Sequence, residues 1–221
     1  MPSGKKTEIP RFTPRSGQTG LSCFNHIKKP GTQTQLRTAF RTEGLLSPSF
    51  TELEIMLRLL DDGMSAPLHR RIFEDKGLAY NIGAELEIYT DTGVLNIDAT
   101  ASHSNIDAIL KETGAIIDDL LSGKLINDHL ERVKKRAVFD TEAMVDYPEI
   151  MNNWFGTSEL YGIAKSIEEE CCKIESVTRE DVAKVSKATF TSDRMQITTV
   201  GTLEADQQSQ IEKSACSMQK V

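Results

Sequence analysis

The sequence lacks an apolar run long enough to span a membrane, and it lacks an excess of positive charge. The formal net charge is −7, with 26 Lys and Arg against 33 Asp and Glu. A basic face is what non-specific nucleic-acid binding requires, so we expect no nucleic-acid partner. The basic start at residues 1–6 has no apolar segment behind it, so we expect no signal peptide in this chain. The compartment stays open between periplasm and cytoplasm.

Cysteine and histidine are also scarce. The four cysteines, Cys23, Cys171, Cys172 and Cys216, contain no C-x-x-C spacing and have no histidine at zinc-finger distance. We expect four free thiols, and a disulfide to Cys23 or Cys216 only in an oxidising compartment. The four histidines include no pair separated by four residues, so no helix turn presents two of them as metal ligands.

What is present is typical of a globular protein. The 221 residues are 38% hydrophobic and 27% charged, enough to build one sizeable core. Residues 1–20 are rich in Pro, Gly, Ser, Thr and Lys and are predicted to be a linker or arm. Residues 21–221 are predicted to form a single domain, with about the last 15 residues as a frayed polar tail.

Alternation of apolar and polar residues predicts the strands. Residues 20–27 are predicted to be an edge strand, and residues 32–42 a strand with Leu36, Thr38 and Phe40 on one face. Residues 78–89 and 94–101 are predicted to form a hairpin that turns at Asp91-Thr92-Gly93. A last strand is predicted at residues 195–200.

Apolar stripes with helical spacing predict the helices. Ser47 or Ser49, then Ser65, and then Ser102 or Ser104 are the expected caps of the helices that follow them, and Thr178 with Asp181 is expected to form a capping box. The helices are predicted to follow residues 49 and 65 and to occupy residues 104–122, 127–147, 149–161, 163–172 and 178–188. This order predicts an α+β fold, a sheet with antiparallel pairs covered by helices.

One stretch carries a more specific signal. Met64-Ser65 precedes a charged helical segment that is expected to end at Gly77, followed by Leu78-Ala79-Tyr80 and the Asp91-Thr92-Gly93 turn. This pattern resembles the pitrilysin/insulinase family of zinc peptidases, and it matches the metal-free half of that family's two-half unit. The resemblance covers roughly residues 32–200. It implies one half-unit of the pitrilysin and mitochondrial-processing-peptidase-like fold.

The resemblance also implies where chemistry should and should not occur. Active members carry H-x-x-E-H, which binds zinc and supplies the general base, and this sequence does not contain it. We therefore expect no metal and no cofactor in this chain, with zinc only in a partner half. Alone, the chain is expected to hydrolyse nothing.

The resemblance points to one candidate catalytic residue. The metal-free half of the family contributes an Arg and a Tyr seven residues apart, which face the zinc and can stabilise the oxyanion. Tyr80 matches the Tyr, but Phe73 stands where the Arg is expected. A core role for Tyr80 is an equally weighted alternative. For Phe73, a core contact under the hairpin is favoured.

The remaining candidate residues would line a substrate chamber. Tyr80, Phe73, Gly77, Trp154 and Phe155 form this set, although Trp154 and Phe155 are favoured as helix-packing residues.

Two functions follow from the resemblance. The first is an inactive domain that pairs with an H-x-x-E-H half, on the same precursor or a partner chain, to enclose peptide substrates. In that function peptides would bind largely by strand addition to a sheet edge. The alternative is a structural pseudopeptidase subunit in a homo- or hetero-dimer, with no role in catalysis.

Overall fold

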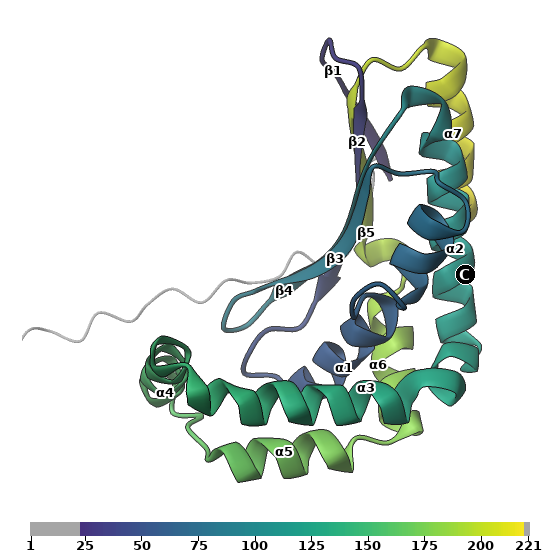
Figure 1. Ribbon diagram of the computed structural model, residues 1–221. Coiled ribbons are helices and arrows are strands. Elements are labelled where there is room, and N and C mark those ends of the chain that lie inside the picture. The colour runs from purple at the N-terminus through teal and green to yellow at the C-terminus, as the bar shows by residue number, and fades with distance from the viewer. Residues whose placement is uncertain (1–22, 219–221) are drawn as a thin grey trace, which may run out of the picture.

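The computed structural model describes residues 23–218, which form one five-stranded sheet and the helices packed against it and beyond one of its ends (Figure 1). The strand order is β1-β5-β2-β4-β3. Their bounds are β1 Phe24–Lys28, β2 Thr34–Thr42, β3 Asn81–Ile88, β4 Gly93–Ala101 and β5 Met195–Gly201. Within the described residues, β1 and β5 pair in parallel, and β2–β4, β2–β5 and β3–β4 pair antiparallel. The predicted α+β fold and the β3–β4 hairpin are confirmed. The predicted linker at residues 1–20 lies outside the described residues.

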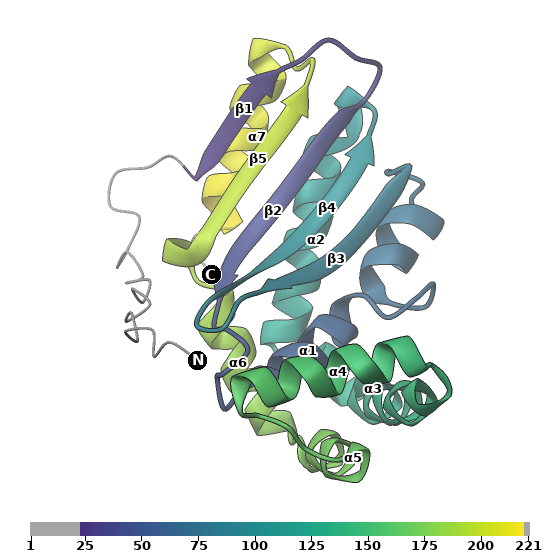
Figure 2. The same ribbon diagram turned by 90° about the vertical axis from the view of Figure 1, so that its left-hand side faces the viewer.

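Helices cover one face of the sheet and leave the other face uncovered (Figures 1 and 2). On the covered face lie α2 (Ile106–Leu121), α6 (Arg179–Thr189) and α7 (Ala205–Met218). The side chains of β2 alternate accordingly, with Leu36 and Phe40 buried and Arg37 exposed. Phe40 packs edge-on against Phe190, with ring centroids 4.8 Å apart. The core therefore lies between the sheet and these helices, where the apolar alternation predicted it.

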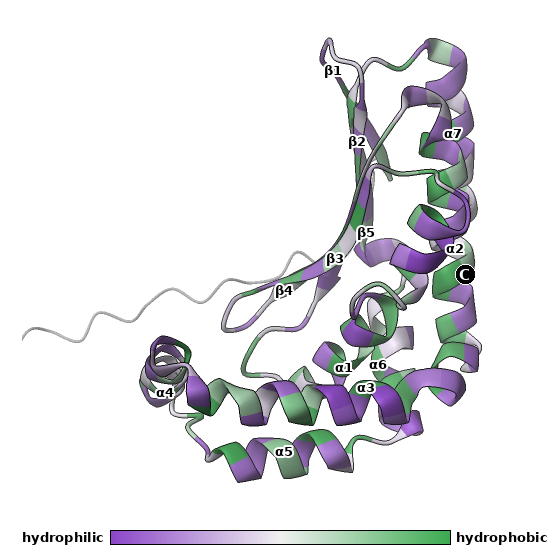
Figure 3. Cartoon of the chain, in the orientation of Figure 1, coloured by the Kyte–Doolittle hydropathy of each residue, from purple (hydrophilic) through white to green (hydrophobic). Residues whose placement is uncertain are grey.

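Further helices pack beyond one end of the sheet (Figure 2). They are α1 (Phe50–Leu60), α3 (Lys124–Ala143), α4 (Pro148–Tyr161) and α5 (Ile167–Ser176). Hydrophilic and hydrophobic residues alternate along α3 and α5, as expected for helices with one buried face (Figure 3). In α4, by contrast, Ser158 is the only buried residue.

Glycines set two of the helix boundaries. Gly123 has φ +83° between α2 and α3, and Gly162 has φ +68° at the end of α4. The predicted helix at residues 163–172 is shifted in the structure, because α5 begins only after Ser166. There Ser166 and Glu169 form a capping box that the sequence analysis missed, while the predicted Thr178–Asp181 box is confirmed.

Ser49 is the N-cap residue of α1, as predicted, but its side chain forms no cap hydrogen bond, and neither do the serines before α2. Ser49 precedes α1, but its hydroxyl donates to Glu43 over 3.0 Å. Ser65 accepts a hydrogen bond from Arg132 over 3.0 Å. Ser102 and Ser104 contact one another's hydroxyls, and no side chain caps α2.

The polar segment after Gly201 forms α7, which packs on α2. Ile211 and Ala215 are buried there, and Asp107 of α2 accepts a hydrogen bond from Ser214 over 2.6 Å. This stretch contributes to the core as far as Met218. The last residues of the predicted frayed tail, 219–221, lie outside the described range.

Candidate functional site

The segment with the family-like sequence is a helical turn followed by a strand. The turn, η1 (His69–Glu74), is a π-helical stretch, and Gly77 follows it with φ +58°. The amide of Gly77 donates to the Phe73 carbonyl over 3.1 Å, and the amide of Leu78 donates to the Ile72 carbonyl over 2.9 Å. An added Cβ at Gly77 would contact nothing within 4 Å, so this glycine is required by its backbone angle alone. The C-cap residue of η1 is Asp75, so the helix ends two residues before the predicted Gly77, which supplies the left-handed residue of the turn that follows.

Tyr80 begins the pairing of this segment with the sheet. Its amide donates to the Thr100 carbonyl over 2.8 Å, and its side chain is 61% exposed. The alternative that Tyr80 is a core residue is therefore wrong for this chain. The side chain of Tyr80 is thus accessible from outside the domain, and its role as a transition-state helper stays a prediction.

Phe73 lies on the surface. Its side chain is 40% exposed, and its ring stands 4.8 Å from the ring of His69, tilted by 36°. The expectation of a core contact under the hairpin is wrong, because the π-helical turn directs residue 73 outward while Ile72 is buried. A role of Phe73 in substrate binding stays a prediction.

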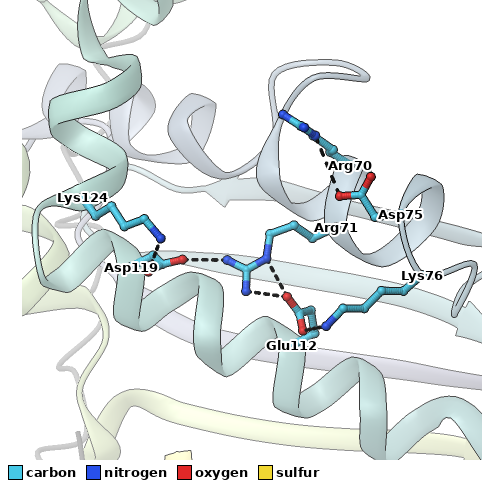
Figure 4. Close-up of polar contacts among 7 residues, drawn as sticks. All are labelled: Arg70, Arg71, Asp75, Lys76, Glu112, Asp119 and Lys124. Atoms are coloured by element: carbon cyan, nitrogen blue, oxygen red, sulfur yellow. Dashed lines mark hydrogen bonds and ion pairs between the residues drawn. The ribbon is translucent and has the colours of Figure 1, made fainter.

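A charged network attaches this segment to α2 (Figure 4). The Arg71 guanidinium donates to Glu112 over 2.6 Å and to Asp119 over 2.7 Å. Lys76 also binds Glu112, and Lys124 reaches Asp119 over 3.2 Å. Arg71 thus points to α2 and does not replace the Arg missing at position 73.

This network has an electrostatic signature. Burial alone would raise the pKa of the Glu112 carboxyl, but hydrogen bonds from Lys76 and Arg71 outweigh burial and hold that pKa below its usual range. The pKa of the Asp119 carboxyl is also below its usual range, because hydrogen bonds from Lys124 and Arg71 outweigh the effect of burial. The sequence analysis missed this network, although a signal existed: Glu112 and Asp119 stand seven residues apart, so they share one helix face.

The uncovered sheet face is polar. Arg37 of β2 binds Asp98 of β4 through two nitrogens at 2.7 and 2.6 Å, and it also lies 3.5 Å from Glu87 and 3.6 Å from Glu85 of β3. These partners hold the pKa of Arg37 above its usual value, chiefly through the hydrogen bond with Asp98. A polar face of this kind can meet water or a polar ligand, not a second apolar layer.

Trp154 and Phe155 lie on α4, with ring centroids 4.9 Å apart. Trp154 borders a cavity of about 610 Å³ between α1, α3, α4 and α5, whereas Phe155 is 40% exposed. Their rings pair with each other, and among the described residues no ring pair joins them to Phe73 or Tyr80. The structure therefore places the five predicted chamber residues in two groups, one before β3 and one on α4.

Two further properties bear on the site. Among residues 23–218, no three His, Cys, Asp or Glu side chains gather as ligands of a metal ion. In the same part of the chain, none of the helices combines the length and apolar character of a membrane span.

Comparisons with known sequences identify relatives of this chain. A family model described as the peptidase M16 inactive domain matches residues 1–137. An uncharacterized zinc protease of Streptomyces coelicolor is 24% identical over 204 residues, which cover 90% of this chain and 44% of that protein. One of Rickettsia felis is 34% identical over 109 residues, which cover 49% of this chain and 26% of the relative. The chain thus spans less than half the length of these curated relatives.

Solved structures share the fold. The peptidase M16 inactive domain from Pseudomonas fluorescens superposes with a TM-score of 0.71 at 19% identity, covering 82% of this chain and 44% of that chain. A conserved protein from Enterococcus faecalis gives a TM-score of 0.73 at 17% identity, covering 85% of this chain and 44% of the other. A chain of complex III2 from Candida albicans gives a TM-score of 0.68 at 14% identity, covering 86% of this chain and 49% of that chain. At these identities the likeness shows the fold alone.

Proposed function

Because the chain belongs to the peptidase M16 inactive-domain family, we propose that it is the non-catalytic half of a two-half zinc peptidase. It pairs with an H-x-x-E-H half, on the same precursor or on a partner chain, and the two halves enclose peptide substrates. The zinc ion and the general base reside in the partner half. The family match is the observation that carries this proposal, and the curated relatives named as zinc proteases support it.

The uncovered sheet face supports the role of a chamber wall. Its charged side chains, such as Arg37 and Asp98, stay hydrated in an enclosed but water-filled space. Peptides bind largely by strand addition, because backbone pairing tolerates many sequences. On β3 one outward amide, that of Ala84, already donates to the Asp61 carboxylate over 2.7 Å.

Exposed apolar residues on α4 support the pairing. Ile150 is 43% exposed and Leu160 is 79% exposed, on a helix that buries only Ser158. Apolar side chains grouped on one surface element often mark a contact with another protein. We infer that the catalytic half, or a second subunit, covers this helix.

Tyr80 is the proposed contribution of this half to catalysis. An exposed hydroxyl at the start of β3 can donate to the oxyanion of the tetrahedral intermediate across the chamber. Such a donor acts on the transition state more than on the bound substrate, so its loss lowers kcat with little effect on KM. Phe73 supplies no charge, and substrate anchoring therefore depends on other contacts.

The alternative function is a structural subunit without a role in catalysis. The Phe at position 73 favours it, since a residue that donates no hydrogen bond replaces the Arg of the usual pair. The fold also occurs in a chain of complex III2 from Candida albicans. A pseudopeptidase of this kind would keep the pairing surface on α4 and lose any dependence on Tyr80.

A reconstitution experiment tests both functions. The chain alone, the candidate H-x-x-E-H half alone and the mixture are assayed for cleavage of a fluorogenic peptide. We expect cleavage only in the mixture, and Tyr80→Phe should lower kcat by about 10²-fold. Tyr89→Phe is the matched control, because Tyr89 is also 61% exposed but lies at the hairpin end of β3. Full cleavage by the catalytic half alone would contradict the helper function and favour the structural one.

A further inference from the structure

A large cavity lies beside α4. It measures about 610 Å³ and is bordered by α1, α3, α4, α5 and the loop at residues 45–47. It forms because α4 stands away from the other helices and buries only Ser158. The loop is held in place by amides of Leu45 and Leu46, which donate to the carbonyls of Tyr89 and Thr90. This volume is in the range of small-molecule binding sites, roughly 300–1,000 Å³.

The walls of the cavity are apolar on two sides. Trp154 and Ile150 of α4 border it on one side, and Ile55 of α1 and Ile174 of α5 border it on another. A ligand here must therefore present an apolar body. The polar groups that border the cavity determine which charged or polar group such a ligand has.

Glu54 of α1 is the acidic group without a partner. Its carboxyl borders the cavity, and none of the hydrogen bonds or ion pairs of residues 23–218 engages it. The two other acids on these walls are already paired. Asp140 of α3 binds Arg58 over 2.7 Å, and Glu170 of α5 binds Lys165.

The remaining charges do not neutralise Glu54. Arg58, on the same helix, is shared between Asp140 and Asp62, the latter at 3.4 Å. Lys173 of α5 borders the cavity without forming an ion pair with Glu54. From α4 come only uncharged groups, among them Asn153 and Thr157. Among residues 23–218, the cavity is thus bordered by one carboxylate without a hydrogen-bond or ion-pair partner, that of Glu54, and by the ammonium group of Lys173, beside an apolar surface.

Burial raises the pKa of Glu54 to about 7, and the nearby Glu170 adds to the effect, while Arg58, Lys165 and Lys173 act in the opposite direction. Near neutral pH the carboxyl is therefore ionised in only part of the molecules. A bound cation would favour the ionised form, and the ring of Trp154 offers a second favourable contact for a positive charge.

We propose that this cavity binds a small organic amine, with its ammonium group at the Glu54 carboxylate and its apolar body against Trp154. A metal ion is disfavoured because Asp140 and Glu170 are occupied by basic partners. A carboxylate ligand would be repelled by Glu54 and attracted by Lys173, whose side chain also borders the cavity, so the anion is the competing outcome of the test. The site uses only residues of this chain and does not depend on the proposed peptidase pairing.

Trp154 makes the proposal directly measurable, since it is the single Trp of the sequence. Its fluorescence is recorded while the full chain is titrated with 2-phenylethylamine at pH 8. The neutral analogue 2-phenylethanol and the anion 3-phenylpropionate are titrated in parallel. We expect a saturable change with the amine, at least tenfold weaker binding of the alcohol, and no saturation with the anion. Binding of the amine should weaken at least tenfold between pH 8 and pH 5, because Glu54 becomes protonated.

Glu54→Gln removes the charge and keeps the shape. This variant should bind the amine at least tenfold more weakly than wild type while binding the alcohol unchanged. Glu175→Gln is the matched control, because Glu175 is exposed on α5 and away from the cavity wall. It should leave amine binding as in wild type.

A second measurement needs no variant. Calorimetric titration of the wild-type chain with 2-phenylethylamine at pH 6.5, in two buffers of different ionisation enthalpy, should reveal a proton released from Glu54. The proposal is overturned if the amine shows no saturable binding, if the anion binds as tightly as the amine, or if no proton is released. None of these outcomes would affect the reconstitution of peptide cleavage, which is measured separately.

Discussion

Arg71 of η1 and Glu112 of α2 form an ion pair with a nitrogen–oxygen distance of 2.6 Å, across 41 residues of sequence. The pair is partly enclosed, with Glu112 only 8% exposed. Because Phe73 and Gly77 follow Arg71 within one or two helical turns, this pair determines where the segment leading to Tyr80 lies on the domain.

Removal of the Arg71 charge should destabilise the protein. Arg71→Met leaves Glu112 with Lys76 alone and Asp119 with Lys124 alone. A fully buried charge deprived of its partner costs about 3–5 kcal/mol, and partial exposure reduces the expected loss here to about 2 kcal/mol. Urea unfolding at pH 7 measures this loss in the free energy of unfolding.

Arg70→Met is the control for this prediction. Arg70 lies 3.8 Å from Asp75 with both side chains exposed, so the loss should stay below about 0.5 kcal/mol. Equal losses in the two variants would show that the α2 network does not hold the segment.

The pKa of Glu112 predicts how stability changes in acid. Its folded-state pKa is below its usual value, so its contribution is complete above the unfolded pKa, about 4.5, and is lost as pH falls toward the folded pKa. Glu112→Gln lacks this contribution at every pH. Between pH 6 and pH 3 the wild type should therefore lose more free energy of unfolding than the variant does. The free energy of unfolding of both proteins is measured with urea at pH 6, 4.5 and 3. An equal decrease in the wild type and in Glu112→Gln would contradict the lowered pKa of Glu112.

Two thiols from the two ends of the described chain are close enough to be oxidised to a disulfide. The sulfur atoms of Cys23 and Cys216 lie 3.6 Å apart. Burial, with the hydrogen bond to Cys216, raises the pKa of Cys23 to about 11, so its own thiolate is scarce at pH 7. Oxidised glutathione should join the pair, and the cross-link should add about 2–4 kcal/mol to the free energy of unfolding.

The variants for this prediction are matched. Cys216→Ser should abolish the cross-link, while Cys172→Ser should not affect it, since Cys172 lies on α5. Peptide mapping by mass spectrometry identifies the bond. An oxidised wild type with no 23–216 link would refute the prediction.

Gly44 allows the loop beside the cavity to approach the β3–β4 turn. A Cβ at residue 44 would lie 2.4 Å from the amide nitrogen of Thr92 and 2.6 Å from the carbonyl oxygen of Tyr89. Both are backbone atoms, so the clash cannot be relieved by a side-chain movement. Gly44→Ala should cost about 1–3 kcal/mol and alter the fluorescence of Trp154.

Gly156 on α4 provides the opposite expectation. A Cβ there would meet nothing within 4 Å, so Gly156→Ala should raise stability by about 0.5–1 kcal/mol through helix propensity. Thermal unfolding of both variants is the measurement. Similar unfolding midpoints for Gly44→Ala and Gly156→Ala would contradict the predicted clash at residue 44.

Local periodicity explains which parts of the fold were predictable. The alternation through Leu36 and Phe40 and the stripe through Ile106 and Leu120 are read directly from the sequence, because burial follows the repeat of each element. Gly77 was predictable because a left-handed backbone angle requires a particular residue type.

Tertiary competition explains what could not be predicted. Ser49 is a residue type that often caps helices, yet its hydroxyl donates a hydrogen bond to Glu43. Phe73 and Tyr80 were given core alternatives, although a π-helical turn and an edge position expose both. The partners of Arg71 are separated from it by a hairpin, and a single sequence does not reveal such pairs. The chemical roles proposed for Tyr80 and the α4 aromatics stay predictions.

The position of β5 has a consequence for how the molecule is made. This strand is the last in the sequence, yet it lies between β1 and β2, which are the first two (Figure 2). Among the strands of residues 23–218, β1 and one side of β2 can therefore pair with β5 only after the ribosome has released residues 195–201. Sheet closure must be a late event of high contact order, and truncated products would expose a hydrogen-bonding edge prone to aggregation.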